Sequence, residues 1–391
     1  MKNSFVGIGV AGCGSIGLRS ALDHFKYGDL DSIARITAVC DPAPGRAKAA
    51  AVKYNIPAYY DSYEEMLVDL NVDMVTLCSP IGLHYDQGMK AIAAGKHIHF
   101  NKTMTVETWE SDDIIAAAEA AGIHIIASPG VAFIPGVQRA RRAVLEGMLG
   151  TLSWAYVDNV AGGGHFHTGE YMRMGDDPLS NVNPTWYFKK PAGGPQYDVA
   201  VYALHNITSI LGPAKRVAAL SGKQHEFHEY RGEKIENEMD DSTTLLIDYG
   251  GGFHVICNSV TADHMMKENF CFPDIHGSKA SLVGRRIGDL PIDKPGDSQP
   301  HAIGVHLELP ERHVFEDIMQ VVELIRGGGG AGGSGNSNAT CSNGKPDIGS
   351  PEQARHVIEI IEAGYRAART GATQELKTTF TPLPIEKLAN W

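Results

Sequence analysis

The first third of the chain alternates between short apolar runs and longer segments in which apolar residues recur with helical spacing. The apolar runs predict buried strands at 5–11, 35–40, 58–60, 74–78, 97–100 and 124–127. Strands that alternate with helices are typical of a parallel sheet with helices on both faces. The pattern therefore predicts an N-terminal α/β domain over residues 1–128.

The pattern changes after residue 128. A predicted helix at 135–146 is followed by segments with strand-like alternation at 153–160, around Val217, and at 243–249, 253–260 and 270–276. Further helices are predicted at 195–211, 312–326 and 351–370, and a low-complexity Gly/Ser/Asn run at 327–345 predicts a flexible surface excursion. Runs of strands after a βα region favour a second, α+β domain with an open, mostly antiparallel sheet, over residues 129–391.

A glycine-rich turn joins the first predicted strand to the first predicted helix. Gly12, Gly14 and Gly17 have the spacing G-x-G-x-x-G, which is typical of dinucleotide-binding turns. Gly14 would let a pyrophosphate approach the backbone, and Ser15 and Ile16 begin the helix whose N–H groups would face the phosphates. The context of strand, turn and helix makes this a candidate cofactor site.

Asp41 ends the second predicted strand, at the position where a carboxylate commonly binds the ribose hydroxyls of a dinucleotide. Its negative charge would repel a 2′-phosphate, so NAD is expected as the cofactor and NADP is less favoured. Arg46, a few residues later, could soften that preference. Because ligands of such sheets bind at the carboxyl ends of the strands, Asp41, Ser79 and Asn101 should lie along the same edge as Gly12.

The composition limits the partners and the compartment. The 391 residues carry a net charge of −12, which argues against a nucleic acid or an anionic membrane as the main partner. The six cysteines include no C-x-x-C pair, as expected in a reducing compartment. The first strand leaves no room for a signal peptide, and no apolar run is long enough to span a bilayer. We therefore expect a cytoplasmic protein that binds a small molecule.

Two places could supply the group that moves a proton during hydride transfer. Lys102 follows a predicted strand on the cofactor edge, where partial burial could lower its pKa. Asp198, Tyr202 and His205 are spaced by four and then three residues, which places them on one face of the predicted helix. Alternatively, Lys102 is a surface lysine and the three helix residues only satisfy one another.

The long loop between 161 and 194 offers candidate substrate contacts. His165 and His167 form an H-x-H pair, but no third ligand follows at a telling spacing, so we expect a polar pocket wall and no metal site. Trp186 and Tyr187 present flat surfaces that suit a sugar ring or the nicotinamide, although simple core packing would also explain them.

Several motifs spread over nearly the whole chain resemble those of a known family. They are GCGSIG at 12–17, CDP at 40–42, SPIGLH at 79–84, AGKHIHFNKT at 94–103, PAGGPQYDVAVYALH at 191–205 and the helix at 350–371. Together they are similar to the motifs of the glucose–fructose oxidoreductase / inositol dehydrogenase / rhizopine-catabolism (Gfo/Idh/MocA) family. The resemblance implies a Rossmann domain followed by a domain with an open-faced sheet, through which members form homodimers or homotetramers.

The resemblance also implies roles for individual residues. Lys102 matches the catalytic lysine, Asp198 the active-site aspartate, and Tyr202 the position of a catalytic His or Tyr. Ser79, Pro80, His84 and Asn101 lie in the motifs that contact the cofactor, with His84 near the nicotinamide end. Two positions depart from the family pattern: Asn101 replaces a Glu, and Thr103 replaces a Pro, so the peptide bond before Thr103 is expected to be trans.

The leading hypothesis is an NAD-dependent dehydrogenase that acts on a secondary hydroxyl of a sugar, polyol or glycoside. Lys102 with Tyr202 would handle the proton, while Asp198 and His205 would orient the substrate. A second hypothesis is a glycoside-cleaving enzyme that retains its NAD and works by transient oxidation and elimination. A third is a non-catalytic NAD-binding sensor, because fold alone does not prove catalysis.

Overall fold

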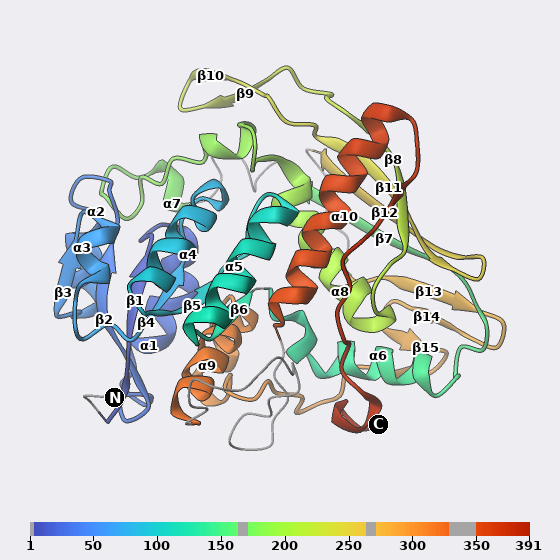
Figure 1. Cartoon of the computed structure of the whole chain (residues 1–391), viewed down its shortest axis with the longest axis horizontal. Helices are drawn as coiled ribbons and strands as arrows, with labels where there is room; N and C mark the ends of the chain where they lie inside the picture. The colour runs from blue at the N-terminus through green and yellow to red at the C-terminus, as the bar shows by residue number, and fades with distance from the viewer. Residues whose placement is uncertain (1–3, 128, 163–170, 263–270, 328–348) are drawn as a thin grey trace.

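Two sheets lie side by side in the computed structural model, each covered by helices (Figure 1). The structure describes residues 4–127, 129–162, 171–262, 271–327 and 349–391. The predicted glycine-rich excursion lies almost entirely outside these residues.

The first sheet has six parallel strands in the order β3-β2-β1-β4-β5-β6. Their bounds are β1 Val6–Ala11, β2 Ala34–Cys40, β3 Ala58–Tyr60, β4 Met74–Leu77, β5 His97–Phe100 and β6 Ile125–Ala127. β1 lies inside the sheet and all six of its residues are buried, which explains why its sequence is a continuous apolar run. The predicted parallel α/β architecture is confirmed.

Helices cover both faces of this sheet. They are η1 Gly17–Leu22, a π-helical stretch that continues into α1 Asp23–Phe25, then α2 Arg46–Tyr54, α3 Tyr63–Leu67, η2 Ile81–Leu83, α4 His84–Ala93 and α5 Thr108–Ala121. Leu18 and Ala47 pack on one face with Ile8, whereas Ala91 and Ile114 belong to the core on the other face. This arrangement directs the carboxyl ends of the strands toward one edge.

The second sheet has nine strands in the order β16-β15-β14-β13-β7-β12-β11-β8-β17. Their bounds are β7 Leu152–Gly162, β8 Arg216–Gly222, β11 Ser242–Gly250, β12 Phe253–Ala262, β13 Asp274–Gly277, β14 Ser281–Val283, β15 Arg286–Ile287, β16 Leu290–Pro291 and β17 Gln374–Glu375. All neighbouring pairs are antiparallel except β7 and β12. The predicted mostly antiparallel sheet is confirmed. Its short edge strands, with two or three residues each, escaped prediction because alternation needs a longer run.

A separate hairpin, β9 Phe227–Tyr230 and β10 Glu233–Glu236, projects beyond the large sheet (Figure 1). The remaining helical segments are η3 Val131–Phe133, α6 Pro135–Leu145, α7 Tyr171–Met174, η5 Thr185–Phe188, the π-helical η6 Gln196–Ala200, α8 Val201–Leu211, η7 Gly304–Glu308, α9 Arg312–Arg326, α10 Pro351–Thr370 and η8 Ile385–Lys387. In this part of the chain, helices therefore interrupt and follow the strands rather than alternate with them.

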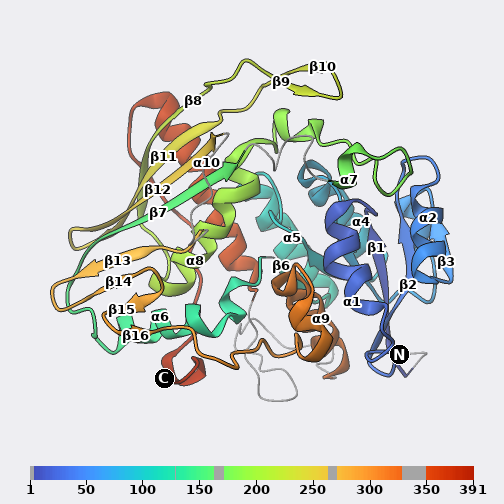
Figure 2. The ribbon, with the colours of Figure 1, turned by 180° about the vertical axis from the view of Figure 1, so that it is seen from behind.

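α10 and α9 join the two halves of the molecule. Val357 and Ile360 of α10 pack in the core of the second sheet, whereas Ile358 packs with the first. α9 follows the second sheet in sequence, but Phe315 and Ile318 pack with the core of the first sheet, beside α1 in Figure 2. The residues that lead into α9 are therefore brought back to the edge where the strands of the first sheet end.

Candidate active site

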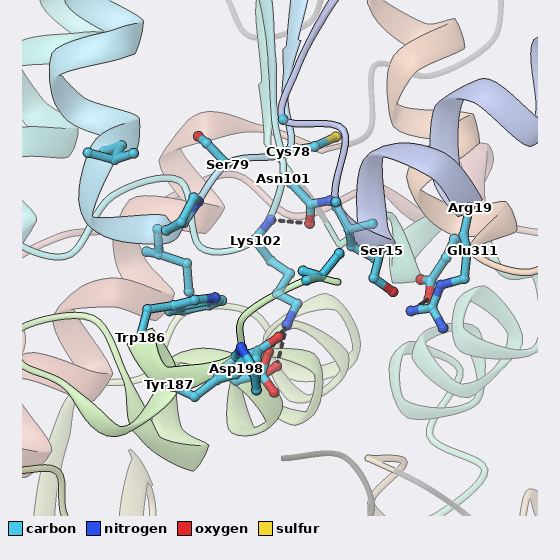
Figure 3. A pocket seen from close by; sticks show the side chains of 18 of the residues that line it. Ser15, Arg19, Cys78, Ser79, Asn101, Lys102, Trp186, Tyr187, Asp198 and Glu311 are labelled. Carbon is cyan, nitrogen blue, oxygen red and sulfur yellow. Dashed lines mark hydrogen bonds and ion pairs between the residues drawn. The ribbon is translucent and has the colours of Figure 1, made fainter. Parts of the chain in front are cut away.

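A cavity of about 1320 Å³ lies at that edge, between the two halves of the molecule. One wall consists of the turn after β1 and the ends of β2, β4 and β5, and the other includes residues 182–187, the helix 196–211 and the entry to α9. Figure 3 shows side chains from both walls pointing into the same space. The cavity is therefore the candidate site for both a cofactor and a substrate.

Most of the residues that the sequence singled out line this cavity. They are Gly12, Gly14, Ser15, Ile16, Asp41, Ser79, Pro80, Asn101, Lys102, Trp186, Tyr187, Asp198 and Tyr202. Gly17, His84 and His205 do not appear in its wall. His165 and His167 lie outside the described residues.

The three glycines of the first turn have different neighbours. Gly12 has a φ of 98°, and a Cβ on Gly17 would lie 2.0 Å from the carbonyl oxygen of Gly12. Only glycine therefore allows the first helix to pack so close to the turn. A Cβ on Gly14 would meet only Val182 of the opposite wall, at 3.5 Å. The space beside Gly14 is open, as a bound pyrophosphate requires.

Asp41 is buried and held by its surroundings at the end of β2. One carboxylate oxygen accepts from the N–H of Cys13 at 2.9 Å, and the other accepts from the N–H of Ala43 at 2.9 Å. Arg46 lies 3.4 Å from that second oxygen and donates to the carbonyl oxygens of Pro178 at 2.9 Å and Asn181 at 2.8 Å. Arg46 thus connects the predicted ribose site to a segment of the second domain.

Lys102 follows β5 and reaches across the cavity (Figure 3). Its ammonium forms an ion pair with the Asp198 carboxylate and donates to the Asp198 carbonyl oxygen at 2.7 Å. The same ammonium lies 5.2 Å from the centre of the Tyr202 ring. The side chains of Lys102 and Asp198 are only 10% and 1% exposed, so the pair is shielded from bulk water. The structure thus brings Lys102, Asp198 and Tyr202 together, as expected from the sequence.

Tyr202 is not a phenol whose pKa is lowered by the neighbouring Lys102 ammonium. Burial raises the pKa of Tyr202 well above its ordinary value, and the carboxylates of Glu311 and Asp198 add to the rise. Tyr202 is therefore a neutral phenol that can donate a hydrogen bond.

Asn101 and Thr103 flank the lysine. The side-chain oxygen of Asn101 accepts from the backbone N–H of Lys102 at 2.6 Å, so it fixes the backbone, while Asp198 holds the ammonium. The Lys102–Thr103 peptide bond is cis. The expectation of a trans bond, which rested on the absence of proline, was wrong.

His84 and His205 are buried beside the site. The ring nitrogens of His84 face the carbonyl oxygens of Thr103 at 2.8 Å and Ser79 at 3.1 Å, so His84 ties together the two turns that carry cavity residues. Burial lowers the pKa of His205 to about 3. The cavity wall continues from Tyr202 to Asn206, four residues on, and His205 is left out of it.

Trp186 and Tyr187 stack on each other, with ring centres 3.9 Å apart, at the second-domain side of the cavity. The guanidinium of Arg173, from α7, lies 5.3 Å from the centre of the Tyr187 ring and also lines the cavity. These side chains form an aromatic and cationic part of the cavity wall.

A further group of cavity residues comes from the entry to α9 and was not predicted by any motif. Glu311 and His313 line the cavity, and Glu311 forms an ion pair with Arg19 of the first helix at 3.0 Å. Arg19 belongs to none of the motifs found in the sequence. Glu311 directly precedes α9 and His313 is its second residue, and the sequence of α9 is that of an ordinary amphipathic helix. Only the return of α9 to the first sheet places them here.

The open space beside Gly14 and the oriented carboxylate of Asp41 fit a dinucleotide.

Within the described ranges, no cluster of three or more His, Cys, Asp or Glu residues could hold a metal ion. None of the helices in the described part of the chain is both long and apolar enough to cross a membrane. Fold and site together define a two-domain nucleotide-binding protein of the Rossmann class.

The family models agree with that class. The model described as "Oxidoreductase family, NAD-binding Rossmann fold" matches residues 6–127, and "Oxidoreductase family, C-terminal alpha/beta domain" matches residues 166–376. The chain belongs to the Gfo/Idh/MocA family of oxidoreductases.

Individual relatives show how far the likeness reaches. The trans-1,2-dihydrobenzene-1,2-diol dehydrogenase of Mus musculus is 27% identical over 222 residues, which is 56% of this chain and 58% of that enzyme. The match thus spans little more than half of the mouse protein. An uncharacterized oxidoreductase of Synechocystis is 31% identical over 296 residues, covering 69% of this chain and 72% of the relative. The crystal structure of the WlbA dehydrogenase from Bordetella pertussis, in complex with NADH and UDP-GlcNAcA, covers 95% of this chain and 99% of that one. Its TM-score is 0.68 at 18% identity, which shows a common fold.

Proposed function

We propose that this chain is an NAD-dependent dehydrogenase that oxidises or reduces a secondary hydroxyl group of a sugar, polyol or glycoside. The observation that carries the proposal is the joint presence of two features in one cavity. The glycine turn and Asp41 lie at one end, and the Lys102–Asp198 ion pair with Tyr202 lies at the other.

NAD is the proposed cofactor because Asp41 offers its carboxylate at the ribose position. The glycine turn and the start of the first helix would hold the pyrophosphate, and the bound nicotinamide would accept or give the hydride. Arg46 adds a positive charge beside Asp41, so NADP should bind as well but less tightly.

The side chains at the other end would bind and orient the substrate. The Lys102 ammonium would donate a hydrogen bond to the oxygen of the reacting carbon, and Asp198 keeps that ammonium in place. The Tyr202 hydroxyl would donate a second hydrogen bond to the same oxygen. Trp186 and Tyr187 would pack against the sugar ring, and His165 and His167 remain proposed polar contacts.

The names of the relatives support this substrate class. The mouse enzyme is named for a diol, and the Bordetella structure is a complex with NADH and UDP-GlcNAcA. The loop 162–190 is longer and more polar than expected for the family, which favours a pocket that accepts more than a free monosaccharide.

The proposal is tested by mixing the protein and NAD⁺ with myo-inositol, D-glucose, D-xylose and methyl β-D-glucoside, and by following NADH absorbance. Formation of NADH with at least one of them, and its loss in Lys102→Met, is the expected result. Cleavage of the glucoside without accumulation of NADH would instead identify a glycosidase that retains its NAD. Tight NAD binding without any turnover would identify a sensor.

A homo-oligomer formed through the second sheet is part of the same proposal. Trp154, Leu220 and Leu246 are exposed, and strand pairing places them on the sheet face opposite the covering helices. An exposed apolar sheet face of this kind favours burial against another copy. Light scattering should show a dimer or tetramer, and Leu246→Glu should shift it toward the monomer.

A further inference from the structure

We propose that residues 172–182 form a strap that covers the adenosine and pyrophosphate half of the cofactor site and has to lift for NAD to enter or leave. The inference rests on the proposed cofactor and not on the proposed reaction. The strap belongs to the second domain, and no sequence motif indicated a cofactor contact there.

The strap is a compact loop whose two ends meet. The N–H of Val182 donates to the carbonyl oxygen of Met172 at 3.0 Å, which closes the loop. Within it, the N–H of Gly175 donates to the carbonyl oxygen of Ser180 at 3.0 Å, and the N–H of Ser180 donates to that of Asp177 at 3.1 Å. Because these backbone groups are satisfied inside the loop, the strap can move as one body about its two ends.

The apolar side chains of the strap pack on the first domain. Met172 is buried in the same core cluster as Ala47 of α2, and Leu179 packs against that cluster. Figures 1 and 2 both show α7 and the segment after it reaching from the second half of the molecule to the side of α2. Burial of these side chains favours the closed position of the strap.

Arg46, the first residue of α2, makes the polar attachment. Its Nε donates to the carbonyl oxygen of Pro178 at 2.9 Å, and its Nη2 donates to that of Asn181 at 2.8 Å. The planar fork of an arginine matches two such acceptors, whereas a lysine offers one point charge. The Arg46 side chain is 16% exposed and lies 3.4 Å from Asp41, so this attachment is directly beside the proposed ribose site.

The strap lies opposite the groups that are expected to hold the cofactor. A Cβ on Gly14 would lie 3.5 Å from Cγ1 of Val182, which faces the pyrophosphate turn across the cavity. Gly14 and Val182 both line the cavity, and so do Asp41 and Arg46. A dinucleotide bound along Gly14 and Asp41 would therefore lie between the first sheet and the strap.

The hairpin β9–β10 holds the other side of the strap. The hydroxyl of Tyr230 donates to the carbonyl oxygen of Arg173 at 2.8 Å. Nη2 of Arg231 donates to the same oxygen at 3.0 Å and to the carbonyl oxygen of Gly175 at 2.6 Å. These three bonds stay within the second domain. The strap would thus remain with the hairpin on opening, and the contacts with Arg46 are the ones that break.

A strap of this kind should slow the cofactor in both directions. It has to open before NADH associates and again before NADH leaves, whereas a residue that only contacts bound NADH would change the release alone. Because NADH has to leave in every cycle of the proposed dehydrogenase, the opening rate would also set an upper limit on turnover.

The first test locks the strap with a reversible disulfide in the full-length protein. A Cβ on Gly45 would lie 4.0 Å from Cγ of Pro178, within the about 3.5–4.5 Å that separate the Cβ atoms of a disulfide, so Gly45→Cys/Pro178→Cys should form the bond. In stopped-flow fluorescence, the oxidised protein should bind and release NADH at least about tenfold more slowly than the same protein after reduction with dithiothreitol. Equal rates in the two forms would overturn the proposal.

This experiment has two kinds of control. Gly45 has a φ of 74°, so Gly45→Ala measures the strain that any side chain creates there. The single variants Gly45→Cys and Pro178→Cys report pairing with the protein's own cysteines. Each should exchange NADH at the same rate under oxidising and reducing conditions.

The second test needs no crosslink and decides the question where the disulfide does not form. Arg46→Lys keeps a cation near Asp41 but loses the fork that holds both carbonyl oxygens. Association and release of NADH should both become about two- to fivefold faster, with little change in the dissociation constant. Arg35→Lys, in the exposed pair with Asp31, is the matched control. Wild-type rates in Arg46→Lys, or faster release alone, would contradict the strap.

The outcomes keep this inference separate from the proposed function. Absence of NADH binding in the wild type would remove the proposed cofactor and the role of the strap together. Normal binding, with rates that neither the crosslink nor Arg46→Lys changes, removes the strap and leaves the dehydrogenase standing. Slow exchange in the crosslinked form supports the strap even if the sugar screen finds no substrate.

Discussion

The two ends of the cavity are built in opposite ways. At the adenosine end, the Cys13 N–H and the Asp41 carboxylate meet across 28 residues of chain, within one strand–helix–strand unit. At the catalytic end, Lys102 meets Asp198 across 96 residues, and Arg19 meets Glu311 across 292. The proposed cofactor end thus has a local framework, which Arg46 links to the second domain, whereas the proposed catalytic end exists only when both halves of the molecule are assembled.

The difference has a consequence for the way in which each end fails. A local turn can be damaged by one substitution without affecting distant contacts. An assembled site depends on ion pairs between separate elements, so the loss of one partner leaves a charge in a shielded place. Substitutions at the two ends should therefore differ in their effects, and the largest effect is expected at Lys102.

Lys102→Met should lower kcat by about 10²- to 10⁴-fold, because it removes the donor to the substrate oxygen. NADH affinity, measured by fluorescence titration, should change little, because the adenosine end is untouched. Asp198 loses its cation in this variant, so Lys102→Met/Asp198→Asn is the matched control for stability. Unchanged turnover in Lys102→Met would remove the lysine from the mechanism.

Gly14→Ala and Gly17→Ala should separate binding from folding at the adenosine end. Gly14→Ala should weaken NADH binding about tenfold or more with an unchanged melting temperature, because its Cβ would enter the open space. Gly17→Ala should lower the stability by about 1–3 kcal/mol, because its Cβ would clash with the Gly12 carbonyl oxygen. Equal effects of the two variants on melting would contradict the distinction.

Arg46→Ala should speed the release of NADH about two- to fivefold, the range expected for a partly exposed ion pair. The reason is that Arg46 holds the carbonyl oxygens of Pro178 and Asn181 over the adenosine end. NADPH affinity should fall more than NADH affinity, because the variant leaves Asp41 without its neighbouring cation. Stopped-flow fluorescence measures the release, and Arg35→Ala, on the exposed pair with Asp31, is the control. Identical release rates for both variants would exclude such a clasp.

The smallest effect concerns the segment that leads to Glu311. Burial lowers the pKa of His301, but its contacts with Glu316 at 2.8 Å and Glu323 at 2.9 Å outweigh burial and raise it above the ordinary 6.5. His301 therefore contributes stability that is fully present below about pH 6.5 and is lost as the pH rises through its folded value. Denaturant unfolding should show His301→Gln destabilised by about 1 kcal/mol at pH 6, with a smaller difference at pH 9. A difference that grows with pH would contradict this assignment.

Much of the fold and the framework of the proposed adenosine end followed from the sequence. The strand and helix periods, the glycine spacing and an acid at the end of the second strand depend on neighbours close in the chain. Their geometry is therefore encoded locally, and Gly12, Gly14 and Asp41 line the cavity at the expected edge. Lys102, Asp198 and Tyr202 could be singled out as well, because a strand end and a four-residue helical spacing are also local.

Tertiary structure alone decided the rest. It left His205 out of the cavity and brought in Asn206. His205 and Asn206 lie three and four residues after Tyr202, so helical spacing allows either to share its face, and only packing selects one. It also placed Glu311 and His313 in the cavity, because the apolar face of α9 is buried against the first sheet and not the second. An amphipathic pattern predicts that a helix will bury one face, but it does not say against which partner, since that choice depends on surfaces formed by residues far away in the chain.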